Sequence, residues 1–319
     1  MTSIQPPIAI DIHQKQAKMG PHPEQKTVLI TGCTPGGIGH ALCLEFHSKG
    51  VHVIATARNP AVLADLGALG MSTLALDVTK SDSIKTCHDQ VSALTGGKLD
   101  ILVNNAGRTH THPATDIDID DVRETFETNV FGVMAMCAAF SDLLINSKGL
   151  IINIASLAAI TPYVFGSVYC ASKGAVVSYS RTLRLELKPF GVRVMVAMTG
   201  TVRSQIASKT HRTLPEGSIY QRVKEIFEKR LTFSQNNATV KTEDYAKKLV
   251  ANALKPEWPL ILRSWFGRAD WFWAGGWSKG VWASTFFGEW ILDFVLYRLI
   301  GLKKMENVLR EEERKKKLT

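Results

Sequence analysis

The chain has 319 residues, of which 45% are hydrophobic and 21% charged, so it can bury the sizeable core of a globular protein. Its net charge is +9, but the basic residues are dispersed except at the C-terminus, which favours phosphate and anionic lipid over nucleic acid as partners. The five cysteines are odd in number and have no C-x-x-C spacing, which predicts free thiols in a reducing compartment.

Residues 1–25 are polar, contain four prolines and lack the apolar run of a signal peptide, so we expect a disordered arm. Thr27–Thr31 predicts a short buried strand. A glycine-rich turn follows, and then a helical pattern through Ser48. A strand, a glycine turn and a helix place a pyrophosphate on the amides of the helix N-terminus. We therefore predict a nucleotide site whose candidate residues are Gly32, Thr34, Gly37, Ile38 and Gly39.

The second predicted strand, Val51–Thr56, is followed by Arg58 rather than by an acid. An Asp or Glu at this distance from the glycines would bind the ribose of NAD, but none occurs before Asp65. A guanidinium suits a 2′-phosphate instead, which favours NADP and NADPH over NAD. An ordinary surface arginine is the alternative.

The third and fourth predicted strands also end in candidate cofactor contacts. Ser72–Leu76 is followed by Asp77, where an adenine would lie. Leu99–Val103 continues into Asn-Asn-Ala-Gly, whose small residues let the backbone approach a cofactor closely. The candidates here are Asp77, Asn104, Ala106 and Gly107.

A long helix is predicted from about Asp118 to Asn146, with Asn129 near its middle. Asparagine is mildly unfavourable inside a helix, so a role in the site would explain it. Two histidines, His110 and His112, and several aspartates precede this helix. They resemble a metal cluster, but alternating aspartates at a helix start more often cap and solvate it, and no metal is predicted.

The fifth predicted strand, Leu150–Ala155, is followed by Ser156, and the helix 167–188 then carries Tyr169 and Lys173. Residues four apart lie on one helix face. A phenol titrates near pH ~10 in water, and a neighbouring cation is expected to lower that pKa. With the Ser156 hydroxyl on the same oxygen, this group suits proton transfer at a carbonyl or carbinol.

A sixth strand, Val192–Met198, precedes the candidate cofactor contacts Gly200, Val202 and Ser204. Strands that alternate with helices predict an α/β fold with a Rossmann-type, doubly wound parallel sheet over residues 26–256. Its ligands bind at the carboxyl ends of the strands, where all these motifs fall. Small residues on the helix 167–188 permit close packing within the subunit or in a homo-oligomer.

Amphipathic helices are predicted at 218–231 and 242–254, with a substrate lid around 203–240. Residues 257–319 form an extension in which all seven tryptophans fall within 33 positions. Because tryptophan favours the headgroup region, we expect residues 258–302 to lie in or dip into one leaflet. A dry subunit interface or a cover over the substrate pocket is the alternative.

The terminal Lys316-Lys317-Leu-Thr matches a dilysine retrieval pattern. The predicted location is the cytosolic face of the endoplasmic reticulum or a lipid droplet, with the cytoplasm as the alternative.

Together these motifs resemble the short-chain dehydrogenase/reductase family between Thr27 and Leu254. The resemblance implies a catalytic tetrad of Asn129, Ser156, Tyr169 and Lys173, in which Lys173 also binds the nicotinamide ribose and Asn129 supports a water relay. The glycine turn is one residue longer than the family pattern, and Thr199-Gly200 replaces its Pro-Gly. Within the family, the motifs and the aromatic tail are most similar to fungal NADPH-dependent 1-acyldihydroxyacetone-phosphate reductases.

The resemblance implies reduction of a small-molecule ketone by NADPH, with a lipid-like substrate such as 1-acyl-dihydroxyacetone phosphate giving lysophosphatidic acid. A ketoreductase acting on a steroid, polyketide or other secondary metabolite has the same fold and chemistry. Two non-catalytic alternatives are a nucleotide sensor and a membrane-surface scaffold whose tail performs the essential role.

Overall fold

The structure, a computed structural model, describes residues 20–22, 24–204, 212–237, 239–256, 258, 262, 267–288 and 290–318. The predicted N-terminal arm lies almost entirely outside these residues. So do residues 205–211 of the predicted lid, together with Trp265 and Glu289.

A parallel sheet of seven strands forms the centre of the molecule, in the order β3-β2-β1-β4-β5-β6-β9. The strands are β1 (Thr27–Ile30), β2 (His52–Ala57), β3 (Ser72–Ala75), β4 (Ile101–Asn104), β5 (Leu150–Ile154), β6 (Arg193–Thr199) and β9 (Trp271–Ala274). The chain order reverses between β1 and β4, and ligands of such sheets bind outside the strand ends at that point. The predicted Rossmann-type α/β fold is confirmed.

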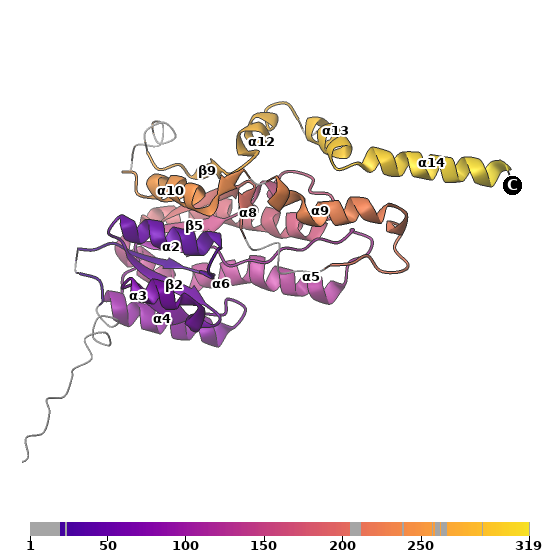
Figure 1. The fold of residues 1–319 in the computed structure, drawn as a ribbon. Helices are drawn as coiled ribbons and strands as arrows, with labels where there is room; N and C mark the ends of the chain where they lie inside the picture. Colours follow the sequence, from indigo (N-terminus) through magenta and orange to yellow (C-terminus); the bar gives the residue numbers. More distant parts are fainter. Residues whose placement is uncertain are drawn as a thin grey trace, which may run out of the picture.

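Helices cover both faces of the sheet (Figure 1). On one face lie α2 (Ile38–Ser48) and α10 (Thr242–Ala253), which pack against each other. On the other face lie α4 (Ser81–Thr95), α6 (Gly132–Ala139) and α8 (Ser167–Leu187). Because both faces are covered, strands such as β1 and β6 are buried throughout, which explains their continuous apolar runs. Short helices η1 (Pro60–Leu63) and α3 (Ala64–Ala68) connect β2 to β3.

The long helix predicted from Asp118 to Asn146 is interrupted. It comprises α5 (Ile119–Phe126), a π-helical turn η2 (Glu127–Phe131), α6 and α7 (Ser141–Ser147). A π-turn inserts one extra residue into a helix and often occurs at functional sites, and this one contains Asn129 at its centre. Asp118 caps α5 by accepting a hydrogen bond from the Asp120 amide at 2.9 Å, so the predicted capping role of these aspartates is confirmed for Asp118.

The seventh strand, β9, comes from the segment that the sequence assigned to the C-terminal extension. It pairs in parallel with β6, so that Trp271 lies opposite Val196 and Trp273 opposite Met198. Both indole rings pack into a hydrophobic cluster with β6 and α8. At the start of β9, Asp270 accepts a hydrogen bond from the Arg193 guanidinium at 2.6 Å. Part of the extension therefore belongs to the sheet.

The loop after β6 packs directly on the loop after β9. Thr201 and Gly276 exchange two backbone hydrogen bonds, of 3.1 and 2.9 Å. A Cβ added to Gly200 would lie only 2.0 Å from the Gly276 carbonyl oxygen. Glycine is therefore required at position 200 because another backbone occupies the space of its side chain.

The predicted lid consists of a short helix η5 (Gln221–Val223) and α9 (Lys224–Asn236), beside the two-stranded pair β7 (Val202–Arg203) and β8 (Val240–Lys241). Phe165, Leu214 and Phe227 hold it to the domain in a separate hydrophobic cluster. Beyond β9 follow α12 (Ser278–Ser284), α13 (Trp290–Leu299) and α14 (Leu302–Leu318) (Figure 1). α14 contacts the lid, since Met305 packs into the same hydrophobic cluster as Phe227 and Glu312 pairs with Arg222 at 2.6 Å.

Within the described residues, no single helix is long and apolar enough to cross a membrane. One bent pair, Ile119–Ala139 with Ser141–Ser147, reaches the required length and composition when the two parts are taken together.

Candidate active site

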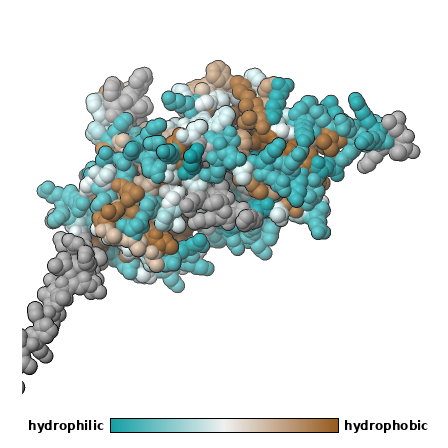
Figure 2. All heavy atoms as spheres, in the orientation of Figure 1, coloured by the Kyte–Doolittle hydropathy of each residue, from teal (hydrophilic) through white to brown (hydrophobic). Residues whose placement is uncertain are grey.

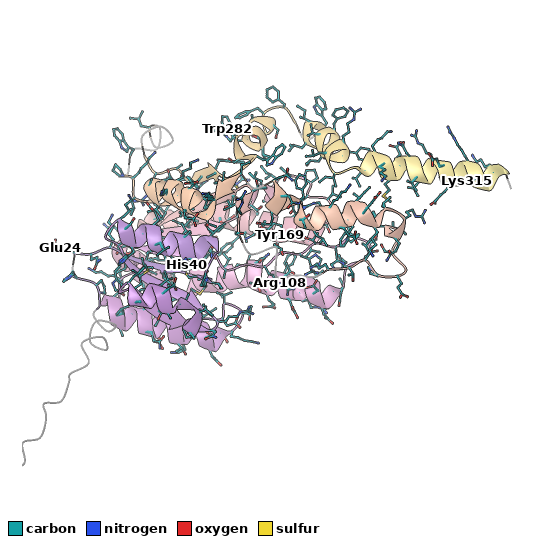
Figure 3. The ribbon with its side chains drawn as sticks, in the orientation of Figure 1. Glu24, His40, Arg108, Tyr169, Trp282 and Lys315 are labelled. Carbon is teal, nitrogen blue, oxygen red and sulfur yellow. The ribbon has the colours of Figure 1, made fainter. Side chains whose placement is uncertain are left out.

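A cavity of about 1030 Å³ opens at the carboxyl ends of the strands. Most of the predicted site residues line it, namely Gly32, Thr34, Gly37, Ile38, Arg58, Asp77, Ala106, Gly107, Ser156, Tyr169, Lys173, Gly200, Val202 and Ser204. In Figure 3, Tyr169 lies inside the body of the domain, with Arg108 near it on the side of α5. The fold thus brings together motifs that are spread over more than half of the chain.

The glycine turn after β1 forms one end of the cavity. Gly32 has a φ of +72°, and a Cβ there would lie 2.9 Å from the Ala106 Cα, so this residue must be glycine. The Asn105 side chain holds the turn by donating hydrogen bonds to the carbonyls of Thr31 and Gly32 at 2.9 and 3.0 Å. Gly39 lies behind the turn and does not line the cavity, because it packs against Asn105.

Arg58 and Asp77 lie at the same end of the cavity, at the ends of β2 and β3. Arg58 is exposed and lines the opening. Burial opposes ionisation of Asp77, but hydrogen bonds from Thr79 and the charge of Arg58 hold its pKa below the ordinary value. The carboxylate accepts from the Thr79 amide at 3.0 Å and hydroxyl at 2.8 Å. Asp77 is therefore ionised at neutral pH, and both side chains line the part of the cavity that a nucleotide would occupy.

Asn104, which the sequence predicts as a cofactor contact, lies elsewhere. Its side chain is buried below the cavity and donates to the Asn153 oxygen at 2.8 Å. Asn104 is the last residue of β4, and its side chain also donates to Cys137 Sγ of α6 at 3.3 Å, whereas Asn105 lines the cavity. The physical reason is the alternation of side chains along a strand, which sends neighbouring residues to opposite sides.

Asn129 is fully buried and does not line the cavity. Its amide group accepts from the Arg108 backbone N–H at 2.8 Å and donates to the Arg108 carbonyl at 3.0 Å. It also donates to the Ser172 hydroxyl at 3.0 Å, and that hydroxyl donates to the Tyr169 carbonyl at 2.8 Å. Asn129 therefore ties the loop after Gly107 to the helix that carries Tyr169.

Tyr169 and Ser156 lie together in the cavity wall. Burial raises the pKa of Tyr169, and a hydrogen bond with Ser156 lowers it by less. The phenol therefore keeps its proton at neutral pH, contrary to the lowered pKa expected from the sequence. Ser156 follows β5 and caps the short helix η3 (Leu157–Ala159) by accepting from the Ala158 amide at 3.2 Å. A protonated phenol beside a second hydroxyl can donate hydrogen bonds to one carbonyl oxygen.

Lys173 is 6% exposed, and its ammonium lies 6.0 Å from the centre of the Tyr169 ring. The Nζ donates to the Ile154 carbonyl at 2.8 Å. Burial lowers the pKa of Lys173 to about 8, so the amine is charged at neutral pH but loses its proton in mild alkali. The positions of the two residues on α8, one turn apart, are those predicted from their spacing.

The histidines and aspartates before α5 form an ionic cluster with the lid. His110 Nε2 lies 3.1 Å from Asp121 Oδ2, and Arg212 Nη1 lies 2.5 Å from the same oxygen. Burial, assisted by the Arg212 charge, lowers the pKa of His110 to about 4. No group of three possible metal-ligating side chains occurs in the part of the chain that the structure describes. The cluster thus joins the lid residue Arg212 to the start of α5.

Another part of the cavity wall is formed by residues of α9, α12 and α13, which were not identified individually from the sequence. Leu231 and Phe233 of α9 contribute to it, as do Trp277 and Val281 at α12. The remaining residues come from α13 and are Leu292, Val295, Leu296 and Leu299. Their spacing of three and four along α13 was a detectable signal for a helix face that meets an apolar surface. This half of the cavity suits a hydrocarbon.

The nucleotide end of the cavity fits NADP or NADPH. The Gly32 turn leaves room for a pyrophosphate, and Arg58 at the opening provides a cation for a 2′-phosphate.

Comparisons with known proteins agree with this geometry. Residues 26–215 match the short chain dehydrogenase family. The chain is 40% identical over 283 residues to the short-chain dehydrogenase srdE of Neurospora crassa, which covers 88% of this chain and 94% of that protein. It is 47% identical over 201 residues to the NADPH-dependent 1-acyldihydroxyacetone phosphate reductase of Schizosaccharomyces pombe, covering 61% of this chain and 68% of that protein.

Among solved structures, a short-chain dehydrogenase from Streptomyces avermitilis superimposes with a TM-score of 0.70 at 25% identity. The superposition covers 89% of this chain and 98% of that one.

Proposed function

The chain belongs to the short-chain dehydrogenase/reductase family, and from this premise we propose that it reduces a lipid-like ketone to a secondary alcohol with NADPH. The observation that carries the proposal is the cavity itself, which has a nucleotide turn at one end, Tyr169 in its wall and an apolar wall at the other end. The experiment that tests it is NADPH oxidation by the purified protein with a panel of ketones.

The residues divide the chemistry between them. NADPH, held by the Gly32 turn and Arg58, would supply the hydride for the carbonyl carbon. Tyr169, kept protonated by burial, donates its proton to the carbonyl oxygen, while Ser156 polarises that oxygen with a hydrogen bond. Lys173 holds a positive charge below the phenol and stabilises the phenolate that remains. Asn129 acts as a positioning residue, because it fixes the Arg108 loop and, through Ser172, the helix beneath Tyr169.

The rate of ketone reduction is expected to vary with pH according to the ionisation of Lys173. Its pKa of about 8 lies below the ordinary value, so its charge is present at neutral pH and is lost as the pH rises through 8. We expect kcat/KM for ketone reduction to be constant near neutrality and to decline above about pH 8. Steady-state rates measured across this range are the test, and a profile that stays flat to about pH 10, the ordinary range of lysine, contradicts the assignment.

The cofactor preference is expected to depend on Arg58. A charge-assisted contact with the 2′-phosphate disappears in Arg58→Ala, so the dissociation constant for NADPH should rise roughly ten- to hundredfold while that for NADH changes little. Arg123→Ala is a matched control, since Arg123 pairs with Asp120 on an exposed surface outside the cavity. Equal use of NADH and NADPH by the unaltered protein would contradict the role of Arg58.

The substrate we propose is 1-acyl-dihydroxyacetone phosphate, which would be reduced to a lysophosphatidic acid. Two observations support it: the NADPH-dependent reductase of that specificity among the relatives, and the apolar side chains that α9, α12 and α13 contribute to the same cavity as Tyr169. The test is to compare kcat/KM for this ketone and for its dephosphorylated form. We expect kcat/KM to be much higher for the phosphorylated ketone.

A ketoreductase of secondary metabolism is the second candidate. The match to the Neurospora crassa short-chain dehydrogenase covers more of this chain than the match to the acyldihydroxyacetone phosphate reductase does, which favours it. This candidate predicts no requirement for a phosphate on the substrate.

We place the protein at the cytosolic face of the endoplasmic reticulum or on lipid droplets, with its C-terminal helices against the lipid. The exposed aromatic side chains of α12 and α13 support this proposal. Full-length protein should pellet with membranes or droplets, resist extraction by salt and be released by detergent. A truncation at residue 256 is unsuitable as a control because it removes strand β9 from the sheet.

A further inference from the structure

Helix α13 has apolar side chains on two opposite faces. The inner row, Leu292, Val295, Leu296 and Leu299, lines the cavity. Trp290 and Phe294 lie on the opposite face of the helix, do not line the cavity and are 67% and 53% exposed. No residue of α13 is buried. α13 also carries the exposed residues Asp293 and Arg298. Large exposed aromatic side chains gathered on one helix face mark an interaction surface.

Exposed aromatic side chains also occur in the turn that follows α12. There Phe286 and Phe287 are 69% and 67% exposed, and Trp282 packs edge-on against Phe286 with ring centres 5.1 Å apart. Figure 2 shows hydrophobic atoms at the surface in the region of these helices, and Figure 3 shows Trp282 at the outer edge of the molecule. We call these five aromatic side chains, of Trp282, Phe286, Phe287, Trp290 and Phe294, the aromatic rim. The aromatic rim adjoins the apolar end of the cavity through α13 itself.

Positive charges accompany the aromatic rim. Lys279 is on α12, and the Arg298 guanidinium stacks on the Phe294 ring, 4.2 Å from its centre. Neither cation forms an ion pair with any residue that the structure describes. Aromatic side chains flanked by unpaired cations are complementary to a phospholipid surface, where the rings lie at the headgroup level and the cations meet anionic lipids. An interface with a protein partner or with a second copy of the chain does not require exposed aromatic rings next to unpaired cations.

We infer that the aromatic rim rests on an anionic phospholipid surface and that the lipid-like ketone enters the cavity from this surface, past α13. The inference rests on the proposed function for its substrate. The inner row of α13 then contacts the hydrocarbon chain of the ketone while the outer row lies in the lipid. The hydrocarbon chain therefore does not cross water between the lipid surface and Tyr169. Leu299 and Val295, which line the cavity and are 45% and 44% exposed, mark the entrance.

The test uses the full chain and substitutes three members of the aromatic rim that do not line the cavity: Phe287→Gln, Trp290→Gln and Phe294→Gln. Binding is measured by flotation with vesicles of phosphatidylcholine and phosphatidylserine, and with vesicles of phosphatidylcholine alone. We expect the triple variant to bind the anionic vesicles at least about a hundredfold more weakly, because three apolar side chains no longer enter the lipid. Its NADPH oxidation with a short, water-soluble ketone should stay within about twofold of the unaltered protein, whereas its activity on a long-chain ketone embedded in vesicles should be lost.

A matched control carries three glutamines at exposed apolar positions of the reductase domain, Leu69→Gln, Leu185→Gln and Phe190→Gln. This variant should bind vesicles as the unaltered protein does. A variant of the inner row separates the two faces of α13. Leu296→Ala should raise KM for the long-chain ketone about tenfold and leave vesicle binding unchanged.

The outcomes are distinguishable. If the aromatic rim variant binds vesicles as the unaltered protein does, the inference that the rim contacts lipid is overturned. If the variant also forms a smaller assembly in solution than the unaltered protein, the aromatic rim is a contact between copies of the chain. Lost vesicle binding with full activity on the embedded ketone overturns entry from the lipid. If the unaltered protein binds vesicles but none of the ketones supports NADPH oxidation, the proposed function fails and the aromatic rim remains a lipid contact.

Discussion

Tyr169→Phe is expected to reduce ketone turnover by about a hundred- to ten-thousandfold, the usual contribution of a positioned proton donor. The substitution removes only the hydroxyl, which the structure places beside Ser156 in the cavity wall. The ring remains, so the cavity keeps its shape and NADPH should bind with unchanged affinity. Single-turnover reduction and NADPH fluorescence titration measure the two quantities separately.

Tyr163→Phe is the matched control. Tyr163 also lines the cavity, with its ring centre 6.3 Å from that of Tyr169 and the Arg230 guanidinium stacked on it. Phenylalanine preserves both ring contacts, and turnover should stay within a few-fold of the unaltered protein. If Tyr169→Phe retained more than about a tenth of the activity while Tyr163→Phe lost it, Tyr163 would be the proton donor instead.

Gly200→Ala is expected to cause the largest loss of stability. The new Cβ would lie 2.0 Å from the Gly276 oxygen, and the clash is with backbone, which cannot rotate away. Overpacking typically costs about 1–3 kcal/mol, and a backbone clash belongs at the upper end of that range. At roughly 2–4 °C per kcal/mol for a large domain, the midpoint of thermal unfolding should fall by about 6–12 °C. NADPH affinity should fall with it, because the loop also lines the cavity.

Gly280→Ala provides the comparison, since a Cβ at this position in α12 has no atom within 4 Å. Alanine is also the better helix former by about 1 kcal/mol, so the midpoint should stay the same or rise slightly. Equal unfolding midpoints for the two variants would show that the contact between the β6 and β9 loops does not contribute to stability.

The sequence predicted six of the seven strands of the central sheet because each is a short apolar run next to a turn, and both faces of a parallel sheet are buried. It did not predict β9, since Trp271–Ala274 is aromatic in a region of clustered tryptophans and has no alternation to distinguish a strand from a surface patch. The break at Asn129 was also missed. A π-turn keeps helical composition on both sides, and only tertiary contacts such as those from Asn129 to Arg108 select it.

Within the site, the predictions were most accurate where chain geometry alone positions the residues. Tyr169 and Lys173 are one helical turn apart whatever surrounds them, and the glycine turn must follow β1. The pKa of Tyr169 could not be predicted, because burial depends on residues from the whole domain. Asn105 lines the cavity and Asn104 does not, because adjacent residues at a strand end face opposite ways, and the sequence does not show which one faces the cavity.

The pairing of β6 with β9 also has a consequence for biosynthesis. The two partners are separated by more than 70 residues, so during translation the β6 edge is exposed while the intervening segment is made. Unpaired strand edges promote aggregation, so the chain is prone to aggregate during this interval. A nascent chain that stops between β6 and β9 should accumulate as insoluble protein, and release from the ribosome beyond residue 274 should restore soluble folding.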